Sequence, residues 1–352
     1  MQKLRSQSPK TYRNTDVRTT NRERTDVRTT NRECTDMRTT NRECTDPQKG
    51  VRTRSACVRT TNRPTTAKNS VGSALAHGFA YLAEAGIPSP RLDAEVLLAH
   101  VLQWNRARLY ARPEFELSEP QWAAFLNAVQ RRSRHEPVPY IVGHREFYGL
   151  DFLVDRRVLI PRPETELLVV KALEINARQQ PGKGRPLLVD VGTGSGILAV
   201  SLAVNLPGAT VYATDTSPDA LAVAAANAAR HGVDGRVHLL RGDLLQPLPE
   251  RVHIIVANLP YIPSGRLPTL DPDVVEYEPL GALDGGPDGL QPIRHLLAQA
   301  GERLLPEGTI LLEIDAEQGP HSMELARRHY PQAQVELYPD DAGLDRMVRI
   351  RT

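Results

Sequence analysis

Cysteine is almost missing from this chain of 352 residues. Its three cysteines, Cys34, Cys44 and Cys57, all lie near the N-terminus, so the remainder has no thiol for a disulfide, a zinc site or nucleophilic catalysis. Long apolar runs are missing too, because no segment approaches the ~18 residues that a membrane span requires. The N-terminus also lacks the apolar core of a signal peptide. We therefore expect a cytoplasmic protein with no membrane partner and no metal.

Excess positive charge is confined to one end of the chain. Lys and Arg number 44 in total, and Asp and Glu number 42. Of these, 16 basic and 7 acidic residues precede Lys68, which leaves 28 basic and 35 acidic residues in the body. An acidic body lacks the broad basic surface of proteins that grip nucleic acid through its phosphates. We expect the body to need no nucleic acid partner and to act as a monomer.

The basic end, residues 1–68, contains a repeat of about ten residues. It begins at Thr15 as TDVRTTNRE and returns from Thr25 and from Thr35. So few apolar side chains cannot offset the entropy of ordering, and we predict a disordered tail. It is either a nucleic-acid-binding arm or an accidental extension upstream of the true start. In the second case the chain from Val71 onward keeps full activity.

Residues 69–135 predict a small helical domain. Phe79 falls on the apolar face of a first helix, and Leu92 falls on that of a second. A third helix begins after Ser118, a favourable N-cap, and carries Phe125. We expect the leucines and aromatics of this segment to form the core of the domain.

Residues 136–166 lose the helical period. Tyr140–Gly143 and Arg145–Val154 alternate apolar and polar residues around glycines, which predicts a hairpin. In the segment that follows, Ile160–Glu166, two prolines flank an arginine and acidic residues stand at a helix start. This segment is a stiff connector, and a passive linker is one interpretation of it.

Residues 167–352 alternate strand and helix, the pattern of a doubly wound α/β sheet. A buried strand, Leu187–Val191, runs into a Gly-rich loop, where the backbone can approach a ligand closely and the following helix start favours negative charge. Polar residues at the ends of the next two strands would meet this loop at one edge of the sheet, the first of them placed to accept hydrogen bonds from a ribose. The predicted cofactor site comprises Gly192, Thr193, Gly194, Ser195, Gly196, Asp215, Asp243 and Leu244. The spacing also suits a dinucleotide, but the loop reads Gly-x-Gly-x-Gly and not Gly-x-Gly-x-x-Gly.

The fourth strand ends in a polar stretch, Asn258, Leu259, Pro260 and Tyr261. Pro260 biases Leu259 towards extended geometry, which directs the Asn258 amide and the Leu259 carbonyl into the crevice beyond the strand ends. Alone, this tetrapeptide also suits an ordinary turn. Beside a Gly-rich loop and two carboxylates it becomes the candidate catalytic and substrate-binding site, and Asn258 also borders the cofactor.

Together these motifs resemble the release factor glutamine methyltransferases, the HemK/PrmC family. The resemblance covers nearly all of the chain after Val71. One departure is Leu259, where the family usually has proline, so the carbonyl is kept but the fixed φ is lost. Besides the Gly loop and the Asn-x-Pro-Tyr stretch, the resemblance is carried by Arg91–Glu95, Arg145–Tyr148, Leu159–Glu166, Tyr277–Pro279, Leu283–Leu290 and Leu311–Ile314.

The resemblance implies a mostly parallel, seven-stranded Rossmann-like methyltransferase sheet and S-adenosyl-L-methionine as cofactor. It implies peptide chain release factors as substrates, methylated on N5 of the glutamine in their Gly-Gly-Gln motif. The Asn258 side-chain oxygen and the Leu259 carbonyl would accept the two amide hydrogens, with Tyr261 packed on the flat amide.

Three alternatives share parts of this pattern. A glutamine methyltransferase acting on a ribosomal protein would use every one of these residues. An adenine-N6 methyltransferase would present the same planar nitrogen from a flipped base, although the acidic body and the lack of an inserted recognition domain argue against it. A module that binds the cofactor without catalysis is the third alternative.

Overall fold

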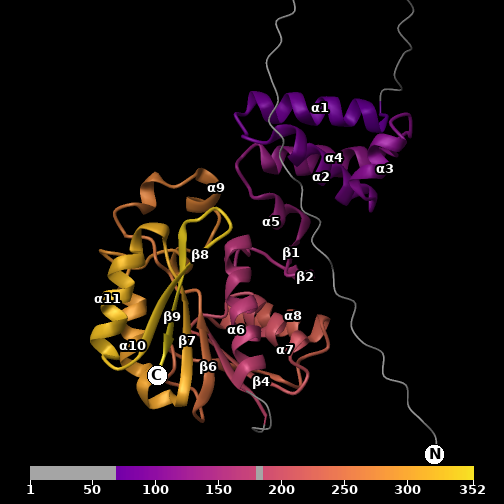
Figure 1. Ribbon diagram of the computed structural model, residues 1–352. Helices are drawn as coiled ribbons and strands as arrows, with labels where there is room; N and C mark the ends of the chain where they lie inside the picture. The colour runs from indigo at the N-terminus through magenta and orange to yellow at the C-terminus, as the bar shows by residue number, and fades with distance from the viewer. Residues whose placement is uncertain (1–68, 180–184) are drawn as a thin grey trace, which may run out of the picture. The chain divides into compact units, whose positions relative to one another are not determined.

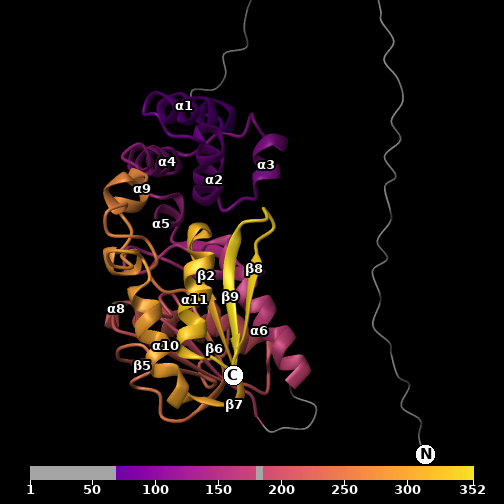
Figure 2. The same cartoon turned by 60° about the vertical axis from the view of Figure 1, so that its left-hand side comes forward.

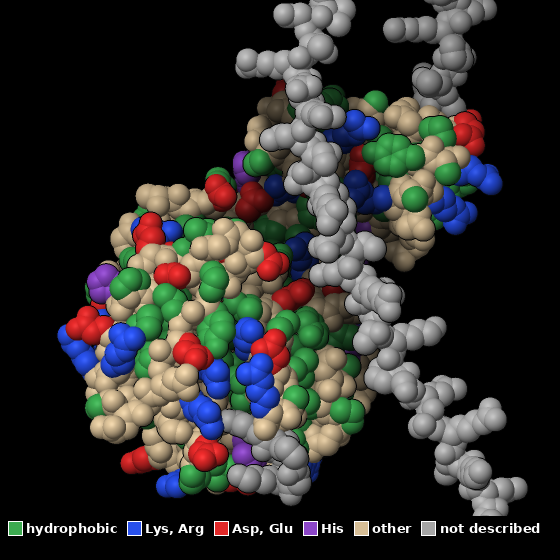
Figure 3. Space-filling view, viewed as in Figure 1, with side chains coloured by type: hydrophobic (Ala, Val, Ile, Leu, Met, Phe, Trp, Pro, Cys, Tyr) green, Lys and Arg blue, Asp and Glu red, His purple; other side chains and the backbone are tan. Residues whose placement is uncertain are grey.

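The computed structural model describes residues 69–179 and 185–352, and the predicted tail lies outside them. All of the described residues belong to one compact unit. Among its described helices, none has the length and apolar character needed to cross a membrane. On the face shown in Figure 3, acidic and basic side chains are interspersed over the described residues.

The helical domain is built as the sequence predicts, with one addition. Ser118 caps its last long helix, where its hydroxyl accepts from the Gln121 amide at 3.4 Å and the Gln121 side chain accepts from the Ser118 amide at 2.9 Å. A short helix between the second and third predicted ones was not expected. The elements are α1 (Val71–Glu84), α2 (Pro90–Leu102), α3 (Arg106–Ala111) and α4 (Glu119–Arg132) (Figure 1).

Five of the leucines and aromatics expected in the core of this domain are exposed, namely Phe79, Tyr81, Leu92, Tyr110 and Phe115. Phe79 is 47% exposed and Leu92 is 45% exposed. The buried face of α1 includes Gly78. A Cβ at this position would lie only 2.7 Å from the Phe125 ring, so a larger residue would not fit. The α1 backbone thus lies directly on Phe125, which is fully buried, and Phe79 is left at the edge of the buried face.

The first half of the predicted hairpin was wrong. Residues 140–142 belong to a short helix, α5 (Val138–Val142), and not to a strand. Prolines are well tolerated in a first helical turn, and Gly143 ends the helix with a left-handed φ of 81°. The hairpin itself is β1 (His144–Phe147) and β2 (Leu150–Leu153), joined through positive φ at Tyr148 and Gly149.

The predicted seven-stranded, mostly parallel sheet is confirmed. Its strand order is β5-β4-β3-β6-β7-β9-β8, and β9 runs antiparallel to both of its neighbours. In two views the last strands, β8 and β9, lie side by side (Figures 1 and 2). The strands are β3 (Leu187–Val191), β4 (Thr210–Asp215), β5 (Val237–Arg241), β6 (Val252–Ala257), β7 (Leu304–Glu313), β8 (Gln334–Pro339) and β9 (Asp345–Arg351).

Helices cover both faces of this sheet. One apolar cluster joins the sheet to α6, α7 and α8, and a second joins its other face to α10 and α11. Figure 1 shows these two groups on opposite sides of the strands. The helices are α6 (Glu166–Gln179), α7 (Ile197–Asn205), α8 (Pro218–Arg230), α10 (Gln291–Arg303) and α11 (Gly319–His329), with a single turn, α9 (Pro272–Val275), after β6.

The order of the strands creates the crevice for the site. After β3 the chain builds β4 and β5 outward to one edge, and then it returns to place β6 on the other side of β3. Ligands of open α/β sheets bind where the direction of winding reverses in this way. The loops after β3 and β6 therefore flank the crevice.

Candidate active site

The Gly-rich loop after β3 uses its three glycines for backbone conformation. Gly192, Gly194 and Gly196 all have left-handed φ, at 72°, 55° and 84°. At Gly196 space is short as well, because a Cβ would lie 3.1 Å from the Cβ of Ala224 on α8. Residues with a Cβ adopt this conformation only with strain. The loop can turn sharply into α7 only because these positions are glycine.

Asp190, a buried residue of β3, forms hydrogen bonds with this loop and with the helix that follows it. Its Oδ2 accepts from the Thr193 hydroxyl at 2.6 Å and from the Ala199 amide at 3.1 Å. Asp190 is 1% exposed, and burial raises the pKa of its carboxyl to about 7. Its other oxygen has no hydrogen-bond partner within the described residues. Asp190 therefore shapes the loop from inside the sheet.

Asp215 ties the end of β4 to the same loop. Its Oδ2 accepts from the Gly194 amide and its Oδ1 accepts from the Ser217 amide, both at 2.9 Å. The carboxylate is half-buried and lines the crevice. Each carboxylate oxygen has two lone pairs, so Asp215 can still accept from a ligand hydroxyl.

The crevice contains a cavity of about 350 Å³, within the usual range for small-molecule sites. The structure brings most of the predicted site residues to its wall. The other residues of the lining include part of the loop Pro279–Asp284 and Leu159, which directly precedes the connector. The predicted residues on the wall are Gly192, Gly194, Asp215, Asp243, Leu244, Asn258, Leu259 and Pro260.

Four predicted site residues are not among those that line this cavity in the described chain. Thr193 and Ser195 are buried and line a smaller adjoining cavity together with Asn258. Gly196 lies against α8. Tyr261 is half-buried, and its carbonyl accepts from Gln318 Nε2 at 2.9 Å. The role proposed for each of these residues stays a prediction.

Sequence reasoning overlooked Thr165 and Glu313 as individual site residues, although both stand in the family motifs. The Asn258 Nδ2 donates to the Thr165 hydroxyl at 3.0 Å, and Thr165 is fully buried. Glu313, the last residue of β7, is 2% exposed, and its Oε1 lies 3.5 Å from the Tyr261 hydroxyl. The only sequence signal for either residue was a polar side chain at a helix start or at a strand end.

The connector before α6 is more than a passive linker. Its Arg162 forms an ion pair with Glu278 at 2.5 Å, and the Ile160 amide donates to the same carboxylate at 3.2 Å. Glu278 is 6% exposed, so its carboxylate is largely shielded from water. The two bonds fix the connector against the segment that follows α9, and Leu159 is thereby held in the cavity wall.

A segment rich in glycine, Leu283–Leu290, supports the loop after β6 from behind. The Gly285 amide donates to the Ile262 carbonyl at 2.8 Å. A Cβ on Gly285 would come 2.8 Å from the Tyr261 Cα, and one on Gly289 would overlap the Tyr261 carbonyl oxygen. Only glycine allows the two backbones to approach this closely. The segment thus fixes the path of the chain after Pro260.

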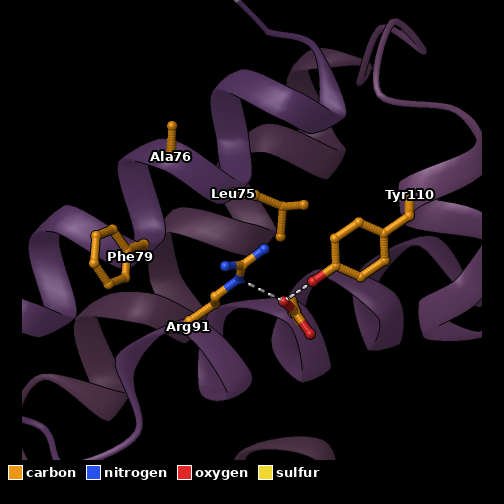
Figure 4. Close-up of a pocket in the computed structure, with 6 residues that line it drawn as sticks. Leu75, Ala76, Phe79, Arg91 and Tyr110 are labelled. Atoms are coloured by element: carbon orange, nitrogen blue, oxygen red, sulfur yellow. Dashed lines mark hydrogen bonds and ion pairs between the residues drawn. The ribbon is translucent and has the colours of Figure 1, made fainter. Parts of the chain in front are cut away.

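A second cavity, of about 240 Å³, lies in the helical domain between α1, α2 and α3 (Figure 4). Arg91 and Tyr110 both donate to the carboxylate of Glu95, and Arg106 adds a 2.6 Å ion pair. Burial alone would raise the pKa of Glu95, but the bonds from Tyr110 and Arg106 hold it below its ordinary value. A fully paired carboxylate is poorly suited to acid-base catalysis, so we do not place the chemistry here.

Two parts of the chain match known protein families. Residues 73–143 match the family described as PrmC N-terminal domain, and residues 164–266 match ribosomal protein L11 methyltransferase (PrmA). The release factor glutamine methyltransferase of Moorella thermoacetica is 46% identical over 274 residues, which span 78% of this chain and 95% of that protein. The chain belongs to the release factor glutamine methyltransferase family.

Other members of the family match over similar lengths. The release factor glutamine methyltransferase of Deinococcus radiodurans is 40% identical over 278 residues, or 79% of this chain and 96% of that protein. That of Geobacter sulfurreducens is 45% identical over 235 residues, or 66% and 80%. Family membership confirms the resemblance that the motifs indicated, and it extends over both the helical domain and the sheet.

Proposed function

We propose that this protein methylates N5 of the glutamine side chain in the Gly-Gly-Gln motif of peptide chain release factors, using S-adenosyl-L-methionine. One observation carries the proposal. Asn258 and Leu259 line the same cavity as Asp215 and two glycines of the Gly-rich loop, Gly192 and Gly194. An acceptor-rich platform therefore stands beside a site suited to a nucleoside cofactor, in a chain whose relatives are named for this reaction.

The cavity suits a cationic nucleoside. Its wall carries three carboxylates, Asp215, Asp243 and Asp284, against one cation, Arg157. Asp215 stands where a ribose hydroxyl could donate to it, and the glycines of the loop admit close approach of a ligand. When bound, S-adenosyl-L-methionine supplies an electrophilic methyl group on a positively charged sulfur.

The residues after β6 supply the positioning that an amide nitrogen needs. The lone pair of a carboxamide is delocalised into its carbonyl, so the nitrogen is a poor nucleophile and gains from orientation more than from a base. The Asn258 Oδ1 and the Leu259 carbonyl are proposed to accept its two hydrogens. As positive charge develops on the nitrogen, these two hydrogen bonds strengthen, which stabilises the transition state more than the ground state.

The choice of substrate is part of the proposal. The curated relatives support release factors, whereas one family match, over residues 164–266, bears the name of a ribosomal protein methyltransferase. A ribosomal protein, as the alternative substrate, would have to present a glutamine to the same platform. We propose release factors because those relatives match over both domains. We expect the enzyme to act as a monomer in the cytoplasm.

The proposal is tested by offering the protein three candidate substrates in parallel. Release factor, ribosomal protein and nucleic acid are each incubated with S-adenosyl-L-methionine labelled in its methyl group. We expect label on the release factor alone, and we expect it to disappear when the Gly-Gly-Gln glutamine is replaced. Label on the ribosomal protein or on nucleic acid alone would refute the proposal.

A further inference from the structure

A strap, residues 271–284, joins the helical domain to the wall of the cavity. It is part of the long connection between β6 and α10, and connections of this length in compact domains usually serve a function. Its first turn, α9, contacts the end of α4 through an ion pair of Asp273 with Arg132. Residues towards its other end line the cavity, namely Pro279, Gly281, Ala282 and Asp284. The strap therefore touches both the helical domain and the proposed cofactor site.

One buried guanidinium, that of Arg132, bonds three separate segments. Its Nε donates to Asp93 Oδ2 on α2 at 2.7 Å, and its Nη1 donates to Asp273 Oδ2 on α9 at the same distance. Nη1 also donates to the Glu136 carbonyl at 3.2 Å. Arg132 is 4% exposed and Asp93 is 6% exposed, so water competes little for these charge-assisted bonds. Arg132 thus holds α9 against α2 and α4.

Further contacts with the helical domain come from the same side of the strap. Asp273 and Tyr277 are four residues apart in α9 and the turn that follows it, a spacing that places both side chains on one side. Asp273 Oδ1 lies 3.1 Å from His135 Nδ1, and the Tyr277 hydroxyl donates to the Arg134 carbonyl at 2.5 Å. The start of the strap is therefore held by several residues at the end of the helical domain.

Glu278 holds the strap at a second point. Its buried carboxylate accepts from Arg162 and from the Ile160 amide in the connector. A segment held at one point alone can still pivot about that point. The contacts of Asp273 and Tyr277 remove this freedom, because they fix the chain before Glu278, whereas the cavity residues come after it. The path of the strap into the cavity wall is therefore set by the helical domain as well as by the connector.

We propose that Asp273 is a positioning residue. Its clasp, the ion pair with Arg132, allows the helical domain to hold the strap in the cavity wall in the position that the cofactor requires. The inference rests on the proposed function for the occupant of the cavity, S-adenosyl-L-methionine. Its structural content, the mobility of the strap, can be measured without any ligand.

Asp273→Ala removes the clasp without leaving a buried charge unpaired, because Arg132 keeps its bonds to Asp93 and to the Glu136 carbonyl. We expect the Kd of S-adenosyl-L-methionine, measured by calorimetry, to rise by about three- to tenfold, since the wall loses a contact worth about one hydrogen bond. With saturating cofactor kcat should stay within about twofold, as expected when a change acts on binding alone. Asp273→Asn, which keeps an acceptor for Arg132, should restore most of the affinity.

Hydrogen exchange of the strap amides, followed by mass spectrometry, separates positioning from a merely structural role. The amides of Ala282, Leu283 and Asp284 donate to carbonyls within the strap, so their exchange reports how firmly it is held. We expect faster exchange in Asp273→Ala. The matched control is Asp271→Ala, since Asp271 is an exposed aspartate of the same strap, makes no side-chain cap bond and forms no ion pair within the described residues. Exchange and Kd in this control should equal those of the unmodified protein.

The outcomes are distinguishable. If the unmodified protein binds no S-adenosyl-L-methionine but exchange is faster in Asp273→Ala alone, the proposed function fails and the clasp stands. If Asp273→Ala folds and its strap amides exchange at the unmodified rate, or if it binds the cofactor as tightly as Asp271→Ala does, the inference is overturned.

Tyr277→Phe decides should Asp273→Ala fail to fold. It removes the hydroxyl that bonds the Arg134 carbonyl and keeps the ring, which lies 4.5 Å from the guanidinium of Arg156. We expect the strap amides to exchange faster in this variant as well. Unchanged exchange in Tyr277→Phe would then overturn the inference.

Discussion

Replacing Gly289 with alanine should damage both the stability of the protein and its activity, although Gly289 is not among the residues that line the cavity. Gly289 has a left-handed φ of 74°, and its would-be Cβ overlaps the Tyr261 carbonyl oxygen and stands 2.5 Å from Gln318 Nε2. Those two groups form the 2.9 Å bond that holds the chain after Pro260. The added methyl group must therefore push them apart.

The magnitude follows from these contacts. A left-handed alanine costs about 1–2 kcal/mol, and the broken hydrogen bond adds about 1 kcal/mol. We expect the free energy of unfolding to fall by roughly 2–3 kcal/mol in total. To regain van der Waals contact the Tyr261 carbonyl must retreat by about 1 Å, and a displacement of that size next to a reacting group lowers kcat by up to about 100-fold.

Urea unfolding and methyl transfer to release factor measure the two effects. Gly265→Ala is the matched control, because Gly265 lies in the same loop region, its Cβ would meet nothing within 4 Å and its φ is not left-handed. We expect that control to behave like the unmodified protein. A Gly289→Ala variant with an unchanged unfolding midpoint and an unchanged kcat would show that the segment Leu283–Leu290 does not hold the loop after β6.

Three further predictions concern individual carboxylates and the platform. Asn258→Ala should lower kcat by about 100-fold or more while calorimetry finds cofactor binding within about tenfold, and complete loss of binding would instead place Asn258 in the cofactor pocket. Asp215→Ala should instead act on the cofactor and weaken its binding by at most a few kcal/mol, since it removes a charged acceptor and the partner of the Gly194 amide. An unchanged Kd of the cofactor would contradict the assignment of Asp215 to the cofactor site. Burial raises the pKa of Asp190 to about 7, so the folded state keeps a proton that the unfolded state releases near pH 4. The stability that this proton contributes is lost as the pH rises through about 7, and Asp190→Asn should gain in unfolding free energy, relative to the unmodified protein, by a few kcal/mol between pH 5 and pH 8.

Much of the fold and part of the site could be predicted because they depend on short stretches of chain. The strands of the sheet read as apolar runs, and each site loop begins where such a run stops. Glycines at 192, 194 and 196 were expected to let the backbone approach a ligand closely, and Gly192 and Gly194 do lie in the cavity wall. The candidate residues Asp215 and Asn258 then reach one cavity because parallel strands end at the same edge of the sheet.

The remainder depends on packing between segments that are distant in sequence. Thr165 lies 93 residues before Asn258, and no local sequence pattern indicates that their side chains form a hydrogen bond. The contact exists because β6 lies between β3 and β7 and because α6 starts above that edge. The prediction that Phe79 is buried was wrong for the same reason. The apolar periodicity of α1 does not show that the Phe125 ring packs against Gly78.

The Gly-rich loop shows why a motif locates a site without saying which atoms face the ligand. The residues between its glycines are polar, and sequence reasoning directed all of them at the cofactor. In the structure the Thr193 hydroxyl turns inward to Asp190, and the Ser195 carbonyl accepts from Asn227 at 2.8 Å. The buried polar groups of a tight loop need hydrogen-bond partners within the protein, and only the remaining groups can face a ligand. The glycines, which have no side chain to satisfy, are then the positions that remain on the cavity wall, as Gly192 and Gly194 do.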